Sequence, residues 1–213
     1  MSNSYDALLT GIAQNGYEFR FGKYFSSGLD LFKRNLSGFL GYSSIIVAIS
    51  LLMNVIPYAG SLIYSLFSTV FMAGMYFVAN EILRDENPGF ERFFRGFQFV
   101  GELILAQIVS FFMILLGLIL LIIPGIYLSV AYSFTSFFII FMRYPYWEAM
   151  EWSRKIVSKN FWPILLFMIV LGLINLAGAL FFGVGMVFTL PFTACVTYCA
   201  FEDIIAGSNR TTS

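Results

Sequence analysis

Long apolar runs separated by short polar segments dominate the pattern of this chain. Six runs come close to the length of about 20 apolar residues that a helix needs to cross the hydrocarbon layer of a bilayer. These runs are residues 39–56, 58–79, 99–122, 125–142, 161–180 and 184–201. The pattern predicts an all-α membrane protein with six transmembrane helices.

The segments between the runs alternate in character. Short uncharged turns follow the first, third and fifth runs, whereas charged stretches follow the second and fourth. Helix-breaking residues mark the uncharged turns at Pro57, Gly60, Pro124, Gly125, Gly178, Gly183 and Gly185. Because Gly and Pro end or bend helices, we expect the chain to fold as three helical hairpins.

Each hairpin is preceded by a segment that is amphipathic at the helical period. In residues 21–36 the apolar positions are Phe21, Phe25, Gly28, Leu29, Phe32 and Leu36. In the second segment, after Asn87 and Pro88 as N-cap and first helical residue, the apolar positions are Phe90, Phe93, Phe94 and Phe97. In the third they are Tyr146, Ala149, Met150, Ser153, Ile156 and Val157. Such helices are typical of a membrane interface.

The unit of interfacial helix, membrane helix, turn and membrane helix recurs three times, which indicates an internal repeat. Its approximate bounds are 21–84, 85–143 and 144–205, within a membrane domain of residues 21–205. Residues 1–20 form an N-terminal cytoplasmic segment and residues 206–213 a C-terminal tail. The register is visible where Lys33-Arg34-Asn35 matches Ser158-Lys159-Asn160, each just before an apolar run.

Composition and charge strengthen this picture. The chain is 59% hydrophobic and 11% charged, whereas soluble domains are about 25% charged. All 12 Lys and Arg residues lie before the first apolar run, in the two charged loops or in the tail. Six crossings place these regions on one face, which the positive-inside rule makes cytoplasmic. Both termini are then cytoplasmic, and a net charge of zero gives no reason to expect nucleic-acid binding.

Hydroxyl groups form a stripe on the second helix of each predicted hairpin. The stripe residues are Ser61, Tyr64, Ser65 and Ser68, then Ser129, Tyr132, Ser133 and Ser136, and finally Thr189, Thr193 and Thr197. Small polar faces of this kind pack membrane helices closely and bond between them. The alternative is a polar path or a lipid-headgroup cavity in the centre between the second, fourth and sixth helices.

Glu102 is the ionisable side chain that the runs place at membrane depth, with Gln107 one to two turns deeper. Charges in that environment are costly and are therefore functional candidates. Two interpretations are open: a role in transport or headgroup binding, or an interfacial carboxylate satisfied by Arg92 or Arg95.

Catalytic chemistry is missing from the sequence. There is no histidine, no Gly-rich phosphate loop, no HExxH and no GxSxG motif, so neither a catalytic nor a metal or cofactor site is predicted. Cys195 and Cys199 lie in an apolar run and are interpreted as packing residues. An intramembrane enzyme would need Glu102 or Tyr132 to be essential.

One stretch resembles a known family. Residues 123–128, Ile-Pro-Gly-Ile-Tyr-Leu, are followed by Trp-Glu-Ala-Met-Glu-Trp-Ser-Arg at 147–154 and by Lys-Asn-Phe-Trp at 159–162. The order resembles the PGI turn, EAxxxSR helix and NFW elbow of uncharacterised bacterial six-helix integral membrane families related to the glycerophosphoryl diester phosphodiesterase membrane domain. The resemblance implies a location in the bacterial cytoplasmic (inner) membrane and transfers no site residues.

These features favour a non-enzymatic membrane protein that organises lipid or a membrane partner through its cytoplasmic interfacial helices. The alternative is a small transporter, permease or lipid carrier that uses the hydroxyl-lined centre. The expected partners are membrane lipids or another membrane protein, and no cofactor is expected.

Overall fold

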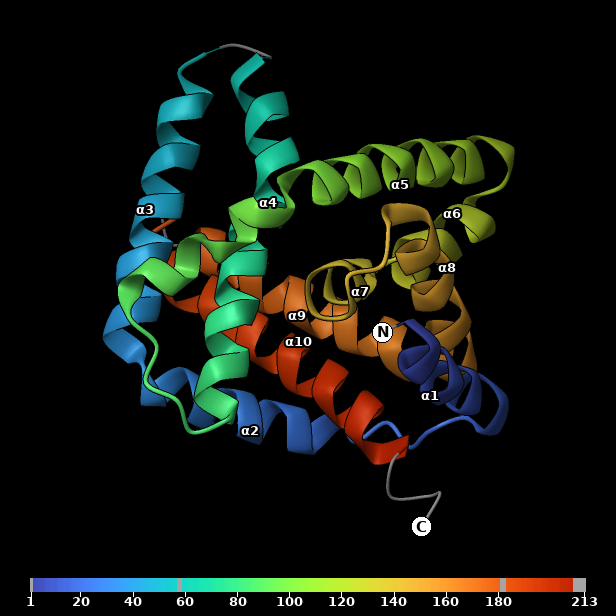
Figure 1. Cartoon of the computed structure of the whole chain (residues 1–213). Coiled ribbons are helices and arrows are strands. Elements are labelled where there is room, and N and C mark those ends of the chain that lie inside the picture. Colours follow the sequence, from blue (N-terminus) through green and yellow to red (C-terminus); the bar gives the residue numbers. More distant parts are fainter. Residues whose placement is uncertain (1, 57–58, 181–182, 209–213) are drawn as a thin grey trace. The chain divides into compact units, whose positions relative to one another are not determined.

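The protein structure, a computed structural model, describes residues 2–56, 59–180 and 183–208, and these residues form helices and turns without a β-strand (Figure 1). Six helical stretches among them are long and apolar enough to cross a membrane. They confirm the predicted all-α fold class. Pro57, in the first predicted turn, and Arg210, in the predicted tail, lie outside the described residues.

Most spanning helices lie close to the predicted runs. They are α3 (Leu36–Asn54), α4 (Ala59–Leu83), α5 (Val100–Leu120), α9 (Phe161–Leu180) and α10 (Met186–Ser208). α9 has the predicted bounds, whereas α10 continues past residue 201, so that Glu202 and Asp203 are helical. The apolar length of each run explains this agreement, because a continuous helix is the simplest way to satisfy the backbone in lipid.

The chain divides into two compact units, which we describe separately. Unit 1 comprises residues 1–21, 101–168 and 200–213, and unit 2 comprises residues 22–100 and 169–199. α9 and α10 contribute residues to both units. The units do not coincide with the three predicted repeats, which stay a prediction.

In unit 2, α2 (Phe21–Arg34) is amphipathic as predicted, but a different face is buried. The buried residues are Tyr24, Gly28, Leu31 and Phe32. Leu29, assigned to the apolar face, is 40% exposed. Gly28 explains the rotation, because a Cβ there would lie 2.7 Å from the Cα of Val196 in α10. The two backbones therefore approach closely at the glycine.

The second predicted amphipathic helix is a 3₁₀-helix, η1 (Phe90–Phe99), which follows Gly89 rather than Asn87. Three residues per turn bring positions i and i+3 onto one face, so that Phe93 and Gly96 are buried. The predicted aromatic face therefore holds only in part. Its other members, Phe90, Phe94 and Phe97, are 39–44% exposed.

The η1 backbone lies directly on α4. A Cβ at Gly96 would lie 2.3 Å from the carbonyl oxygen of Val70, and a Cβ at Gly74 would lie 1.9 Å from the carbonyl oxygen of Phe93. The Phe93 ring stacks on Tyr42 of α3, with 4.7 Å between the ring centroids. Two glycines thus let η1 approach α4 closely enough for one phenylalanine to enter the core of unit 2.

Unit 1 contains a helix that the sequence pattern did not predict, α1 (Ser2–Asn15), which packs on α8 (Tyr146–Val157). Leu9 and Ile12 of α1 are buried. The Tyr144 hydroxyl donates to the Asp6 carboxylate. Burial and this carboxylate raise the pKa of the Tyr144 phenol, so the hydroxyl keeps the proton that it donates to a higher pH than an exposed tyrosine would. The apolar run of this segment is short, so the sequence pattern predicts only a cytoplasmic extension here.

The fourth predicted span is broken into α6 (Ile122–Ala131) and α7 (Thr135–Met142). Ser153 of α8 satisfies the backbone at the break. Its Oγ donates to the carbonyl oxygen of Ala131 at 2.6 Å and accepts a hydrogen bond from the N–H of Phe134 at 3.2 Å. A helix can be interrupted at membrane depth where neighbouring protein groups replace the missing bonds, and Ser153, which is fully buried, supplies both.

α8 confirms the predicted third amphipathic helix. Its buried residues are Ala149, Met150, Ser153, Ile156 and Val157. On its outer face Glu151 forms an i,i+4 pair with Lys155, with a nitrogen–oxygen distance of 3.6 Å, and a closer pair with Arg154 at 2.8 Å. The short 3₁₀-helix η2 (Ser158–Asn160) then leads into α9.

Candidate functional site

Several hydroxyls of the predicted stripes bond to their own helix. Ser68 donates to the carbonyl oxygen of Ser65 at 2.6 Å, and Ser129 donates to that of Ile126 at 2.8 Å. Ser61 and Ser65 are exposed, and Tyr64 is hydrogen-bonded to Ser50. A hydroxyl that bonds one turn back along its own helix needs no cavity.

The α10 stripe takes part in helix packing within unit 2. The amide of Asn175 in α9 donates to Thr193 Oγ1 at 3.2 Å, and Thr197 donates to the carbonyl oxygen of Thr193 at 2.7 Å. The Thr189 hydroxyl is buried without a hydrogen-bond partner among the described residues. These contacts agree with the packing interpretation of the stripe.

The stripe predicted on the fourth span does not lie on one helical face, because the span is broken between α6 and α7. Tyr132 and Ser133 lie in the break, and Ser136 is in α7. The hydroxyls of Ser133 and Thr135 are buried and have no hydrogen-bond partner in the described part of the chain.

Glu102 bonds to a backbone group in the described structure, and the arginine pairing predicted for it is not what its contact shows. Its Oε2 accepts a hydrogen bond from the backbone N–H of Tyr146 at 2.8 Å. It therefore satisfies a free N–H at the start of α8, where the helix dipole favours a negative charge. Gln107, one to two turns deeper, is half-buried.

Among the residues that the structure describes, the buried carboxylate is Glu81, which the sequence pattern did not single out. It is 7% exposed, in the last turns of α4. Its Oε1 lies 2.9 Å from Arg95 Nη1 and 3.6 Å from Arg92 Nη1, the two arginines that had been assigned to Glu102. Its helical position, three residues after the buried Val78, is the signal of this burial, but the apolar run in the sequence ends at residue 79.

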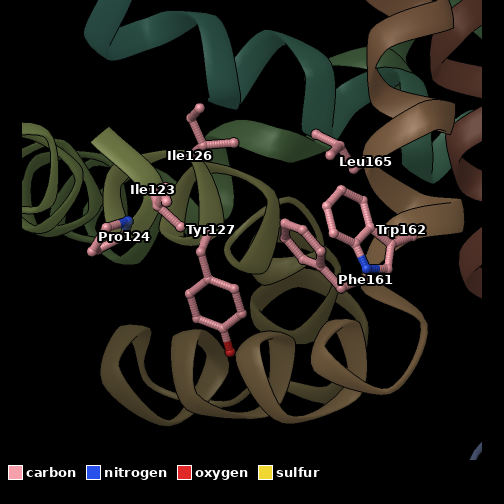
Figure 2. Close-up of a pocket in the computed structure, with 7 residues that line it drawn as sticks. All are labelled: Ile123, Pro124, Ile126, Tyr127, Phe161, Trp162 and Leu165. Carbon is pink, nitrogen blue, oxygen red and sulfur yellow. The ribbon is translucent and has the colours of Figure 1, made fainter. Parts of the chain in front are cut away.

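An apolar groove of about 530 Å³ lies in unit 1 between the first turns of α6 and the first turns of α9 (Figure 2). Its walls expose no polar surface. The lining residues are Ile123, Pro124, Ile126, Tyr127, Phe161, Trp162 and Leu165. We call it the α6/α9 groove. Among these residues the rings of Tyr127 and Phe161 pack together, with 5.5 Å between their centroids.

The border of the α6/α9 groove is polar on the side of α8. Figure 2 shows the Tyr127 hydroxyl directed toward a helix that runs below the groove, and this hydroxyl is hydrogen-bonded to the guanidinium of Arg154. The Arg154 guanidinium also donates two hydrogen bonds to the Glu151 carboxylate, at 2.8 and 3.1 Å. Lys155 and Lys159 are exposed on the same stretch.

The groove brings together two segments that the charge pattern places on opposite faces of the membrane. The turn at Pro124 was predicted to lie outside and the start of α9 inside, yet both line one groove. A straight crossing by α6 would separate them by about 30 Å. Hydropathy identified an apolar hairpin here, but it carries no information on how deep the hairpin reaches.

We expect a probe at Ile123 to report the same membrane depth as one at Trp162. Ile123 is 81% and Trp162 75% exposed, so both tolerate Ile123→Cys and Trp162→Cys spin labelling after Cys195 and Cys199 are replaced by Ala. Leu180→Cys marks the other end of α9, about 27 Å along the helix. Power-saturation spectroscopy in vesicles measures the three depths. If the label at residue 123 instead reports the depth of the label at residue 180, the result would support the predicted position of the Pro124 turn on the outer face.

A second pocket, of about 290 Å³, lies in unit 2 at the start of α3. Its lining residues are Asn35, Ser37, Gly38, Pro88, Phe90 and Phe93. In the predicted repeat, this elbow before α3 corresponds to the elbow before α9. The two asparagines act differently, because Asn35 Oδ1 accepts from the N–H of Gly38, whereas the Asn160 amide donates to the carbonyl oxygen of Tyr17.

Metal and thiol chemistry find no geometric basis in the described residues. No three His, Cys, Asp or Glu side chains among residues 2–56, 59–180 and 183–208 lie close enough to hold a metal ion. Cys195 and Cys199 are buried, and they are not joined to each other by a disulfide bond.

Comparison with known proteins adds no functional assignment to this geometry. A scan against protein-family models, a search of curated proteins and a search of solved structures each returned no match.

Proposed function

We propose that this chain is a non-enzymatic integral membrane protein that gathers anionic phospholipid around the helices at its cytoplasmic interface. One observation carries the proposal: η1 and α8, which lead into membrane helices, keep large aromatic side chains outside the core on elements that also carry Arg and Lys residues. On η1, Phe90 and Phe94 are each 44% exposed, next to Arg92 and Arg95. On α8, Trp147 is 59% exposed.

Physical chemistry connects this pattern to lipid. Aromatic rings favour the headgroup level of a bilayer, where one side of the ring is apolar and the other wet. Cations near an anionic leaflet contribute about 1 kcal/mol each. An element with both features binds the interface and enriches anionic lipid there.

The transporter alternative is supported by a different observation, the interrupted span at 132–134. Discontinuous helices form substrate sites in many transporters, and the hydroxyls of Ser133 and Thr135 are buried there without partners in the described chain. The stripe hydroxyls that bond to their own helices weigh against it, so we rank it second.

Lipid selectivity measured by spin-labelled phospholipids tests the proposal. In vesicles at low salt, the motionally restricted shell of the protein is expected to prefer phosphatidylglycerol over phosphatidylcholine severalfold, and about 0.5 M salt should remove most of this preference by screening. Replacing the exposed Lys33 and Lys155 by Gln should lower the preference, whereas Arg at both positions should keep it.

Equal restriction of the two lipids at low salt would contradict the proposed function. Solute flux through protein-containing vesicles that is lost on Ser133→Ala, without a change in lipid selectivity, would favour the transporter instead.

A further inference from the structure

We propose that the α6/α9 groove binds one acyl chain of an anionic glycerophospholipid, whose phosphate lies against Lys159 and the Arg154–Tyr127 pair. This inference rests on the proposed function and adds to it a defined site with a defined orientation of the ligand.

The groove has the size and the walls of a site for a hydrocarbon chain. Its volume of about 530 Å³ lies within the range of about 300–1,000 Å³ that is typical of ligand pockets. No polar surface lines it, so a chain that enters loses no hydrogen bond. Ile123 and Trp162 at its rim are 81% and 75% exposed, and the groove is therefore open to the surrounding lipid.

The arrangement of the side chains gives the groove a direction. Figure 2 shows residues of α6 and residues of α9 on two sides of the groove, with Tyr127 pointing away from Ile126 at the lower border. The Tyr127 hydroxyl is bonded to Arg154. The apolar body of the tyrosine thus contributes to the wall, and its polar end marks the boundary at which a hydrocarbon chain must give way to a headgroup.

Charge at that boundary favours an anionic headgroup. Residues 151–159 contain three cations and one carboxylate, which leaves a formal excess of two positive charges. Glu151 already forms ion pairs with Arg154 and Lys155. Lys159 is exposed, two residues before the start of α9. A phosphodiester beside Lys159 would neutralise part of this excess through charge-assisted hydrogen bonds.

Other occupants fit less well. A peptide segment would need partners for its backbone N–H and C=O groups, and the apolar walls supply none. A second copy of this chain, docked through a twofold axis, presents the same surface from both sides. It would bring two stretches with a positive excess together, which costs free energy. A phospholipid combines an uncharged chain with a negative headgroup, the order that the groove and its border require.

Photolabelling in nanodiscs tests the site. Phosphatidylglycerol that carries a diazirine in its acyl chain is expected to label residues 123–127 and 161–165, as mapped by mass spectrometry. Ile126→Trp fills the groove at a position that is 43% exposed, so most of this labelling should be lost. The matched control is Leu173→Trp, which places the same side chain at a 58% exposed position of α9 outside the groove and should leave the labelling unchanged.

A second pair of variants tests the orientation. Lys159→Gln should lower the preference of the groove for phosphatidylglycerol over phosphatidylcholine about fivefold, the value expected for one cation at an anionic interface, whereas Lys159→Arg should keep it.

Failure of the site and failure of the proposed function are distinguishable. If the shell still prefers anionic lipid but the labels spread evenly over the spanning helices, or if Ile126→Trp behaves like Leu173→Trp, the groove is not the site and the proposed function stands. Loss of anionic preference in the wild-type shell overturns both. A Trp162→Cys disulfide dimer that forms equally in both lipids would assign the groove to a second copy and overturn the inference.

Discussion

Replacing Ser153 by Ala is expected to lower the free energy of unfolding by about 3 kcal/mol. The substitution removes the one oxygen that serves both backbone groups at the break between α6 and α7, the carbonyl of Ala131 and the N–H of Phe134. Each buried backbone group left without a partner costs about 1–3 kcal/mol. Because Ser153 is fully buried, water does not replace the lost hydrogen bonds.

The control is Ser158→Ala, which removes an exposed hydroxyl that donates to the carbonyl oxygen of Lys155 and should change stability by less than about 0.5 kcal/mol. Equilibrium unfolding in mixed micelles gives the difference, and hydrogen exchange at residues 131–135 locates it. If the two alanine variants unfold alike, Ser153 does not hold the broken span together.

Replacing Gly74 by Ala should destabilise unit 2 by about 3 kcal/mol. The added Cβ would lie 1.9 Å from the carbonyl oxygen of Phe93, and both atoms belong to backbone segments that cannot rotate away. Overpacking a tight contact costs about 1–3 kcal/mol, and here η1 must lift off α4. The Phe93 ring would then leave its stack on Tyr42.

Gly101→Ala is the matched control, because a Cβ at Gly101 of α5 meets no atom within 4 Å. It should be neutral or should stabilise by about 0.5–1 kcal/mol, since alanine favours a helix over glycine. Thermal unfolding of both variants in the same detergent makes the comparison. A Gly74→Ala protein as stable as Gly101→Ala would mean that η1 does not lie on α4 as described.

Several features could be predicted because they depend on neighbours in the chain. Runs of about 20 apolar residues set the spanning helices, and α9 has the bounds of its run. The buried face of α8 also followed from the helical period, because the segment is a regular α-helix. The same method misplaced the buried face of α2 and half of η1. There, a glycine contact with Val196 in α10 and a change to three residues per turn determined which side chains are buried.

The electrostatic partners illustrate the same limit. Glu102, Arg92 and Arg95 lie within ten residues of one another in the sequence, and pairing them was reasonable. In the folded chain both arginines contact Glu81 of α4, and Glu102 accepts from the N–H of Tyr146, 44 residues away. A buried carboxylate pairs with the cations that tertiary packing places beside it. Separation in the sequence therefore does not identify its ion-pair partners.

Apolar length and charge placement were enough to identify a six-helix membrane protein with amphipathic elements before its hairpins. The interrupted span, the burial of Glu81 and the α6/α9 groove required the folded chain. Each depends on groups that are remote in sequence, as when Ser153 satisfies a carbonyl 22 residues away. A helix breaks in an apolar environment only where another element supplies the missing hydrogen bonds, and a groove exists only where two elements meet without filling the space between them.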